Sequence, residues 1–482
     1  VEILERSRDP VILPRAVGLD GESVRAFQRI GLGDEVAALC QPPRARDEVT
    51  FTNSRRERLF GMEIPRVGAN GWRDIAFFDQ PELEAFLRRQ VEQDDRIAVC
   101  LGREVTKIAQ SADEVVLHSR DASGGAEQEH RAAYAIGADG ASSFVRRAIG
   151  SEWKSLGYDQ DWLVVDIVQG PDAELPLVTM QVCDPVRLTT YVCVKDPNRR
   201  WEFQRLDGET REELLRPEKI RELLRPWVAP EHYEIRRAAV YQFHAAIAER
   251  WRVGRVCLAG DAAHQTPPFL GQGLNTGFRD AVNLGWKLPL VLAKQCDARL
   301  LDSYAAERDA HSRDLVEWAV ALGQLMETLA AREAGEPDPY PTDQRSGYGQ
   351  GRSAPPLRGG VLVTEQCNGA HPAGELLRQP TVRRPDGSEC RFDELLGPGF
   401  SVVGRRPSDL RMGAGARGVL QRLQGRSVSL EGLEVVAGAS DLLFDEHPAL
   451  VLRPDRYVFG VVDDAFDLDR LLAELAQKLA LC

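Results

Sequence analysis

The segment 254–275 combines residue types that suit a bound nucleotide. The apolar run 256–259 ends at Gly260 and Asp261, which predicts a strand whose exit presents a carboxylate. Two prolines and two glycines then precede a long helical pattern, where free backbone N–H groups can hold an anion. A carboxylate can accept hydrogen bonds from ribose or ribityl hydroxyls, and glycines let the backbone approach a flat ring. We therefore predict a cofactor site formed by Gly260, Asp261, Pro267, Gly271, Gly273, Leu274 and Asn275.

Length and composition indicate a soluble protein of two or three domains. The chain has 482 residues, of which 43% are hydrophobic and 28% are charged. Its net charge of −13 argues against nucleic acid or an anionic membrane surface as a partner. No apolar run reaches the length of a membrane span. The nine cysteines form no Cys-x-x-Cys pair, so we expect reduced thiols in the cytoplasm and no metal site.

The first residues read as a buried strand that ends in an acidic side chain, Glu5. In a dinucleotide-binding fold such a residue follows the glycine-rich phosphate loop by about twenty residues and accepts the ribose hydroxyls. We predict this role for Glu5, although the Gly-x-Gly-x-x-Gly loop is absent from the sequence. Either about thirty preceding residues are missing, or the protein has lost its pyrophosphate cradle. We favour the first, because the later motifs are intact.

Two further segments place polar residues next to predicted helices. Gln80 comes just before a helix that starts at Pro81, so its amide lies at the helix N-terminus; a simple helix cap is the alternative. Asp139 ends a predicted strand at 132–138 and begins the run Asp139-Gly140-Ala141-Ser142-Ser143-Phe144-Val145-Arg146. This run combines a strand exit, a glycine that permits close approach and a serine near a helix start.

These motifs together resemble those of the flavoprotein aromatic hydroxylases, the family of para-hydroxybenzoate and phenol hydroxylases. Segment 254–275 is similar to the second FAD fingerprint of this family, and the run from Asp139 is typical of it. The resemblance implies that Arg15 reaches FAD and that Gln80 contacts the flavin or its ribityl chain. It also implies that Asp139 lies near the pyrophosphate, in a region linked to the use of NADH or NADPH.

The predicted fold is α/β, with a Rossmann-like FAD-binding domain that lacks its phosphate loop. Residues 1–154 are its first part, and 251–332 are its second part with a helical region that breaks at Pro289. Short β-branched or aromatic runs over 155–250 predict a mixed-sheet substrate domain. Residues 333–360 read as a linker. The resemblance implies a thioredoxin-like domain without a redox pair over 361–482.

The chemistry that the resemblance implies belongs mainly to the cofactor. Flavin reduced by NADH or NADPH reacts with O2 to give a C4a-hydroperoxide, which transfers oxygen to a phenol ortho to its hydroxyl. The runs Cys183-Asp184-Pro185 and Arg200-Trp201-Glu202-Phe203 are similar to those of the 3-(3-hydroxyphenyl)propionate hydroxylase subgroup, which implies a phenolic acid as substrate. Arg187 and Arg200 are candidates to bind its carboxylate, and each could equally be an exposed strand residue. His244 is a candidate substrate contact, whereas His264 reads as a hydrogen-bond partner within the turn.

Two alternatives stay open at this point. Related tailoring enzymes that hydroxylate aromatic polyketides share the flavin motifs. A non-catalytic remnant without FAD would also account for the absent phosphate loop. The choice between NADH and NADPH is open, and a homo-oligomer is neither indicated nor excluded by the sequence.

Overall fold

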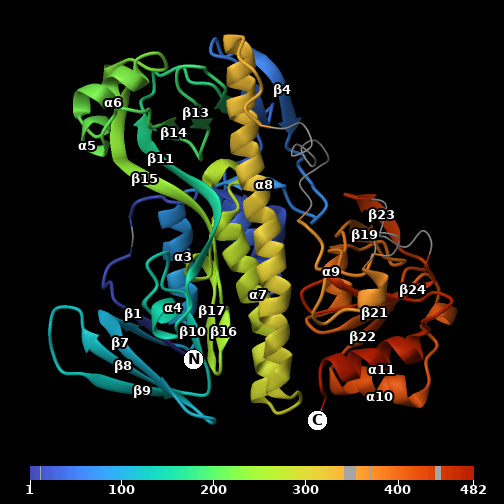
Figure 1. Cartoon of the computed structure of the whole chain (residues 1–482). Helices are drawn as coiled ribbons and strands as arrows, with labels where there is room; N and C mark the ends of the chain where they lie inside the picture. The colour runs from blue at the N-terminus through green and yellow to red at the C-terminus, as the bar shows by residue number, and fades with distance from the viewer. Residues whose placement is uncertain (11, 341–353, 368–371, 440–446, 482) are drawn as a thin grey trace.

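The computed structural model describes residues 1–10, 12–340, 354–367, 372–439 and 447–481. Three lobes surround two central helices, α7 (Gly273–Leu292) and α8 (Asp302–Ala334) (Figure 1). An N-terminal lobe lies at the lower left of the view, a sheet lobe at the top and a C-terminal lobe at the right. Among the described residues, no helix combines the length and the apolar character that crossing a membrane requires.

The N-terminal lobe holds parallel strands in two separate pieces. Strand β1 (Glu2–Glu5) pairs in parallel with β6 (Ala98–Leu101). Strand β10 (Ala135–Gly137) pairs in parallel with β17 (Val256–Leu258), which β16 (Arg252–Val253) joins. Ile3, Val99 and Ile136 are exposed on these strands. Both pieces of the described parallel sheet thus carry apolar side chains at the surface.

The rest of this lobe is made of a small antiparallel sheet, a two-stranded ladder and four helices. Their bounds are β2 (Gly18–Asp20), β5 (Ile75–Phe77), β7 (Arg103–Gln110), β8 (Val115–Asp121), β9 (Gln128–Ala132), α1 (Gly21–Gln28), α2 (Gly33–Leu39), α3 (Gln80–Glu92) and α4 (Phe144–Ala148). The helix predicted from Pro81 begins one residue earlier, with Asp79 as its N-cap.

The sheet lobe is built on one eight-stranded sheet of order β18-β15-β11-β14-β13-β12-β3-β4. Its longest strands, β11 (Trp153–Gln169) and β15 (Tyr233–Ala248), run down toward the N-terminal lobe (Figure 1). The others are β3 (Glu48–Thr52), β4 (Arg58–Glu63), β12 (Thr179–Val182), β13 (Thr189–Val192), β14 (Asn198–Gln204) and β18 (His264–Gln265). The sheet therefore includes two strands from the range 1–154.

The two faces of this sheet have different surroundings, because side chains alternate along each strand. On one face Trp201 and Phe203 join a buried cluster with residues of α5 (Arg211–Leu214) and α6 (Pro217–Leu224). The opposite face carries Arg200 and Trp162, which contact segments of the N-terminal lobe and the 254–275 segment. We call this second face the inner face.

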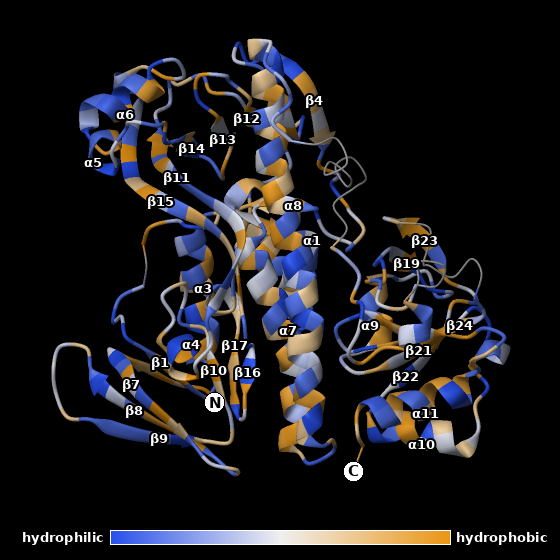
Figure 2. Ribbon diagram, in the orientation of Figure 1, coloured by the Kyte–Doolittle hydropathy of each residue, from blue (hydrophilic) through white to orange (hydrophobic). Residues whose placement is uncertain are grey.

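Helix α7 has a buried face that is mostly polar. Figure 2 shows hydrophilic and hydrophobic residues alternating along its length. The helix continues through Pro289 to Leu292, so the predicted break at this proline is wrong. Pro289 lies in the last turn, and its carbonyl accepts a hydrogen bond from the Ala293 N–H at 2.9 Å, so only the end of the helix is affected.

The C-terminal lobe contains a four-stranded sheet of order β22-β21-β24-β25 and a three-stranded one of order β20-β19-β23. The strands are β19 (Thr381–Arg383), β20 (Glu389–Arg391), β21 (Ser401–Gly404), β22 (Arg426–Ser429), β23 (Glu434–Ala437), β24 (Ala449–Leu452) and β25 (Val458–Val461). The helices are α9 (Phe392–Leu396), α10 (Ala414–Arg422) and α11 (Leu468–Lys478). Helix α8 covers the start of the predicted linker, and residues 341–353 of that linker lie outside the described residues.

A fully buried cluster of charges joins the central helices to the C-terminal lobe. Glu307 on α8 accepts hydrogen bonds from Lys287 Nζ at 2.8 Å and from Arg453 Nη2 at 2.7 Å. Arg453 also binds Asp455 at 2.6 Å, and Asp455 accepts the indole N–H of Trp286 at 2.9 Å. Burial raises the pKa of Glu307, but the two cations outweigh this and lower it to about 2. The carboxylate is therefore charged and essential to the cluster.

Candidate functional site

The turn after β17 leaves Asp261 exposed, and its Gly260 packs closely against helix α7. Gly260 has a φ of 60° and begins a short 3-10 turn, Gly260–Ala262. A Cβ on Gly277 of α7 would lie 3.3 Å from the Gly260 Cα, so the turn and the helix approach closely because both residues are glycine. Asp261 is exposed and has no side-chain partner among the described residues. Its carboxylate is available to a ligand.

Asp280, inside the same helix, fixes this turn. It accepts the Gly260 N–H at 2.9 Å and contacts His264 Nε2 at 2.9 Å and Arg308 Nε at 2.8 Å. Burial raises the pKa of Asp280, but His264 and Arg308 outweigh burial and hold the pKa below its usual value. His264 thus bonds to α7 and not within its own turn, and it also stacks on Trp251.

The N-terminus of α7 begins without a side-chain cap. Gly271, with a φ of 63°, ends the preceding 3-10 turn, and Gln272 is the N-cap residue. The carboxamide of Asn275 is engaged within the protein: its oxygen accepts from Asp20 N and Ser23 Oγ, and its nitrogen donates to Gly271 O at 2.7 Å. The groups that could bind an anion here are therefore the backbone N–H groups of Gly273, Leu274 and Asn275.

Arg15 and Gln80 lie together. The Gln80 side-chain oxygen accepts the backbone N–H groups of Arg15 at 2.7 Å and Ala16 at 2.8 Å. This fixes the loop that carries Arg15, whose guanidinium is exposed and has no partner among the described residues. Gln80 is thus a support for the loop, while the Arg15 side chain is free to reach a ligand.

Asp139 and Glu5 occupy the ends of the two parallel strand pieces. Asp139 is exposed, accepts the Val145 N–H at 3.0 Å and contacts Ser143, so it supports the start of α4, whose N-cap is Ser143. Glu5 ends β1, and one of its oxygens accepts the Ser7 N–H at 2.7 Å. Parallel strands present their C-terminal ends at one edge of a sheet, which is where such folds bind ligands.

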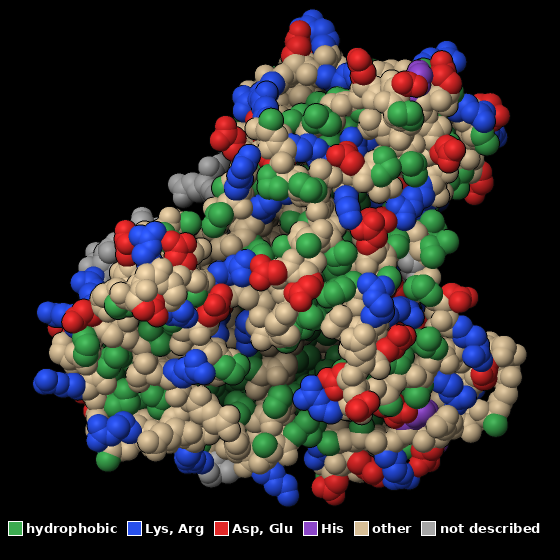
Figure 3. Space-filling view, turned by 180° about the vertical axis from the view of Figure 1, so that it is seen from behind, with side chains coloured by type: hydrophobic (Ala, Val, Ile, Leu, Met, Phe, Trp, Pro, Cys, Tyr) green, Lys and Arg blue, Asp and Glu red, His purple; other side chains and the backbone are tan. Residues whose placement is uncertain are grey.

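The inner face of the sheet touches two loops and leaves a row of residues between them. At one end, Arg200 pairs with Asp166 at 2.7 Å and donates to the carbonyls of Pro14 and Arg15. At the other end, the ring of Trp162 lies 5.4 Å from that of Phe269, in the segment between Pro267 and Gly271. Seen from behind, the surface is hollowed where the lobes meet, with hydrophobic side chains inside the hollow (Figure 3).

Glu202 lies in that middle row. The register pairs Glu202 with Val164. On this face of the sheet, the pair lies between the Asp166–Arg200 pair and the Trp162–Gln204 pair. Glu202 is 6% exposed, and its carboxyl makes no hydrogen bond within the described residues; it forms an ion pair with Arg200, whose Nη1 lies 3.9 Å from Glu202 Oε1. Burial raises the pKa of this carboxyl to about 7, although Arg200 opposes the shift.

The remaining candidates already have protein partners. His244 contacts Asp159 and lies beside Phe243, whose ring packs against Trp162 on the inner face. Because side chains alternate, His244 lies on the other face, away from Trp162. Arg187 forms a two-pronged pair with Glu209 at 2.6 and 2.9 Å. With Arg200 bound to Asp166, neither candidate arginine offers a free guanidinium to a substrate carboxylate.

Comparison with known proteins identifies the family of this chain. The chain matches the model described as "FAD binding domain" over residues 1–319 and the "HcaD C-terminal domain" over residues 374–478. It is 32% identical to a probable NADH-specific resorcinol 4-hydroxylase of Rhodococcus jostii (strain RHA1), covering 100% of this chain and 91% of that protein. The chain belongs to the FAD-dependent aromatic hydroxylases. It is thus a flavoprotein monooxygenase that acts on an aromatic substrate.

Other relatives of this hydroxylase carry different substrate names. A 3-(3-hydroxy-phenyl)propionate/3-hydroxycinnamic acid hydroxylase of Paraburkholderia xenovorans (strain LB400) is 31% identical over 100% of this chain and 88% of its own length. Among solved structures, aklavinone-11 hydroxylase with FAD and aklavinone aligns with a TM-score of 0.81 and 24% identity, over 99% of this chain and 94% of that one. This last likeness shows a shared fold.

Two residues of the candidate site were not predicted from the sequence. Asp280 lies in the middle of a helical pattern, where a carboxylate reads as a solvated side chain, and only the folded contact with Gly260 shows its role. Glu202 lies in the Arg-Trp-Glu-Phe run that gave the subgroup resemblance, but its burial depends on strand register. A glutamate between two aromatic residues, Trp201 and Phe203, was the available signal for Glu202.

Proposed function

We propose that this hydroxylase uses FAD, NADH or NADPH, and O2 to add a hydroxyl group to a phenol ortho to its existing one. The observation that carries the proposal is the placement of a buried carboxyl, Glu202, which has no hydrogen-bond partner among the described residues, between the Arg15 loop and the Gly271 loop. A phenol is most easily hydroxylated near its phenolate form, which requires a proton acceptor close to its hydroxyl.

Several residues of the candidate site fit FAD. Asp261 would accept the ribityl hydroxyls, and the uncapped N-terminus of α7 would donate to the electron-rich edge of the flavin ring. Arg15 would approach the cofactor from the opposite side, and Glu5 would bind the adenosine ribose. Asp139, near the C-terminal edge of β10, would lie close to the pyrophosphate. Bound FAD supplies the hydride acceptance and oxygen activation that the side chains themselves lack.

The protein contributes binding, orientation and proton transfer. Glu202 in its carboxylate form would accept the phenolic proton, and Thr190 and Val164, which pair with it on neighbouring strands, would line the same part of the inner face. Trp162 and Phe269 would close the apolar end of the site and keep water from the reacting ring. Arg200 fixes the Arg15 loop to the sheet and so positions the two sides of the site.

For the substrate we propose a single-ring phenol, of which 3-(3-hydroxyphenyl)propionate and resorcinol are the two named by full-length relatives. The ion pairs of Arg187 and Arg200 favour the uncharged ring over the phenolic acid. An aromatic polyketide is the second candidate, supported by the fold shared with aklavinone-11 hydroxylase. The rate of flavin reduction by NADH can be measured in the presence of 3-(3-hydroxyphenyl)propionate, resorcinol or aklavinone. This distinguishes the three candidate substrates, because the true substrate should accelerate flavin reduction most.

The order of the C-terminal sheet also supports a proposal about that lobe. Strand β21 pairs in parallel with β22, whereas β24 and β25 are antiparallel, and α10 and α11 lie beside them. We propose that this is a thioredoxin-like domain with a structural role in the hydroxylase.

Replacing Asp261 by alanine is expected to weaken FAD binding by about tenfold, because hydrogen bonds to a charged acceptor would be lost. Titration of the apoprotein with FAD, followed by quenching of flavin fluorescence, measures this dissociation constant. Asp207→Ala is the matched control, since Asp207 is also exposed but lies on the sheet lobe. If Asp261→Ala binds FAD as tightly as the Asp207 variant does, Asp261 does not hold the cofactor.

A further inference from the structure

An apolar groove lies between the N-terminal lobe and the C-terminal lobe, along α7. It has a volume of about 550 Å³, within the range of small-molecule sites. Its walls come from the end of α1, from α7 between Phe278 and Leu290 and from loops of the C-terminal lobe; Figure 2 shows α1 beside α7. The main lining side chains are Phe27, Phe278, Trp286, Leu290, Phe400 and Leu423.

One cation in this groove forms no ion pair with any described residue. Arg29, the residue that caps the C-terminal end of α1, lines the groove and makes no side-chain hydrogen bond among the described residues; its Nε is fully buried. A buried donor without an acceptor is unfavourable, and most such groups in folded proteins have a partner. Arg29 is thus a donor that a ligand could satisfy.

The acidic groups near Arg29 are already engaged by other residues. Asp393 binds Arg25 at 2.6 Å and Arg456 at 3.2 Å. Asp455 binds Arg453 and Trp286. Burial lowers the pKa of Arg29 to about 10, and the neighbouring Arg456 adds to this effect. At neutral pH the guanidinium is therefore charged, in a local excess of positive charge.

A second, small cavity of about 20 Å³ adjoins the groove at Arg29, large enough for about one water molecule. It shares Ala26, Arg29, Phe278 and Val282 with the groove. Arg29 thus lies where the apolar groove adjoins a small cavity lined largely by charged side chains, which is an arrangement that suits a molecule with an apolar body and one anionic end.

We propose that this groove is a binding site for an aryl carboxylate, separate from the FAD site. The aromatic and aliphatic walls would hold the ring, and Arg29 would pair with the carboxylate where the groove adjoins the small cavity. Charge complementarity selects this class: a neutral aromatic would leave the guanidinium unpartnered, and a small inorganic anion would leave the apolar walls uncovered. The inference rests on the groove alone and does not depend on the substrate proposed above.

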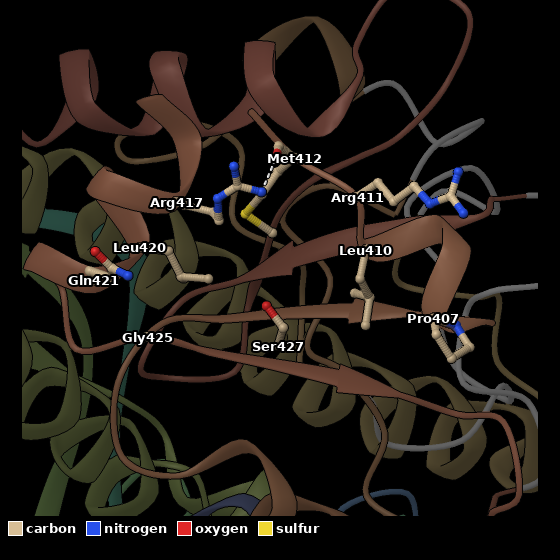
Figure 4. A pocket seen from close by; sticks show the side chains of 9 residues that line it. All are labelled: Pro407, Leu410, Arg411, Met412, Arg417, Leu420, Gln421, Gly425 and Ser427. Atoms are coloured by element: carbon tan, nitrogen blue, oxygen red, sulfur yellow. Dashed lines mark hydrogen bonds between the residues drawn. The ribbon is translucent and has the colours of Figure 1, made fainter. Parts of the chain in front are cut away.

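Another pocket shows what distinguishes this groove. A pocket of about 640 Å³ opens on the C-terminal lobe, where Arg411 extends away from Arg417 (Figure 4). Arg417 is exposed and donates to the Met412 carbonyl at 2.6 Å. Its charge is thus solvated and has a partner, unlike that of Arg29, and this makes Arg417 a suitable control.

Isothermal titration with 2-naphthoate, in the presence of saturating FAD, tests the proposal. We expect one mole of 2-naphthoate to bind per mole of protein and 2-naphthalenemethanol, its neutral analogue, to bind at least about tenfold more weakly. Arg29→Met should weaken 2-naphthoate binding by about tenfold or more, and Arg417→Met should leave it unchanged.

A second variant tests the groove without changing the charge of Arg29. Gly285 lines the groove on α7, and a Cβ built there meets no atom within 4 Å. Gly285→Leu should therefore fold normally and block binding by filling the groove, with circular dichroism and the melting temperature as checks. Equal binding of the acid and the alcohol, or 2-naphthoate binding that survives both variants, would overturn the proposal. Binding of chloride or phosphate alone would do the same.

Discussion

Glu202→Gln should reduce the rate of hydroxylation by about 10²–10⁴-fold, the usual contribution of a positioned proton acceptor. Glutamine keeps the size of the side chain but cannot accept the phenolic proton. In the unmodified protein the rate should fall as the pH drops through about 7, because Glu202 then becomes protonated and the pKa of this buried carboxyl lies near that value. The variant should lose this limb of the pH profile.

The same variant also tests the pH dependence of stability, which runs in the opposite direction to that of the rate. Because the folded protein holds the proton of Glu202 more tightly than the unfolded chain, the free energy of unfolding should decrease as the pH rises from about 4.5 through about 7. Glu202→Gln should abolish this decrease. Product formation and NADH oxidation by stopped flow test the first effect, and urea unfolding at several pH values tests the second.

Glu234→Gln is the matched control for both measurements, since Glu234 lies on β15 but is exposed. It should leave the rate, the pH profile and the stability unchanged. If Glu202→Gln retains full hydroxylation with an unchanged pH profile, the proton acceptor is a different group and the placement of the substrate on the inner face fails.

The largest stability effect is expected at the buried cluster that joins the lobes. Glu307→Ala should lower the free energy of unfolding by about 3–5 kcal/mol, because Lys287 and Arg453 would be left buried without their shared carboxylate. Urea denaturation at pH 7 measures this. Since the folded-state pKa of Glu307 is lowered to about 2, the stabilisation is complete above about 4.5 and is lost as the pH falls through about 2.

Glu317→Ala on the same helix is the control, because Glu317 is exposed. It should change the unfolding free energy by no more than about 0.5 kcal/mol. A similarly small effect of Glu307→Ala would mean that the cluster does not hold the lobes together, and the C-terminal lobe would then be expected to unfold separately.

The sequence predicted the local features of the site better than its long-range contacts. The strand exit at Gly260, the helix start near Gly273 and the helix at Gln80 follow from glycine, proline and apolar spacing over a few residues, and the structure has elements at these positions. The family itself was also predicted from these motifs, and the comparisons confirm it.

Contacts between distant segments could not be predicted in this way. The position of His244 on the face away from Trp162 depends on strand register, where a shift of one residue exchanges the two faces. The partner of Arg200, Asp166, lies on another strand, so the sequence alone left Arg200 available for a substrate. The inclusion of β3 and β4 in the large sheet likewise rests on the pairing of β3 with β12, about 130 residues further along the chain.

Isotope incorporation tests the central claim most directly. The FAD-loaded protein is given NADH and ¹⁸O₂ with 3-(3-hydroxyphenyl)propionate or resorcinol, and the product is analysed by mass spectrometry. The proposed function predicts a product that carries one labelled oxygen as a new hydroxyl group ortho to the existing one. It would be contradicted if NADH were oxidised only to yield labelled hydrogen peroxide, with no labelled product from either phenol.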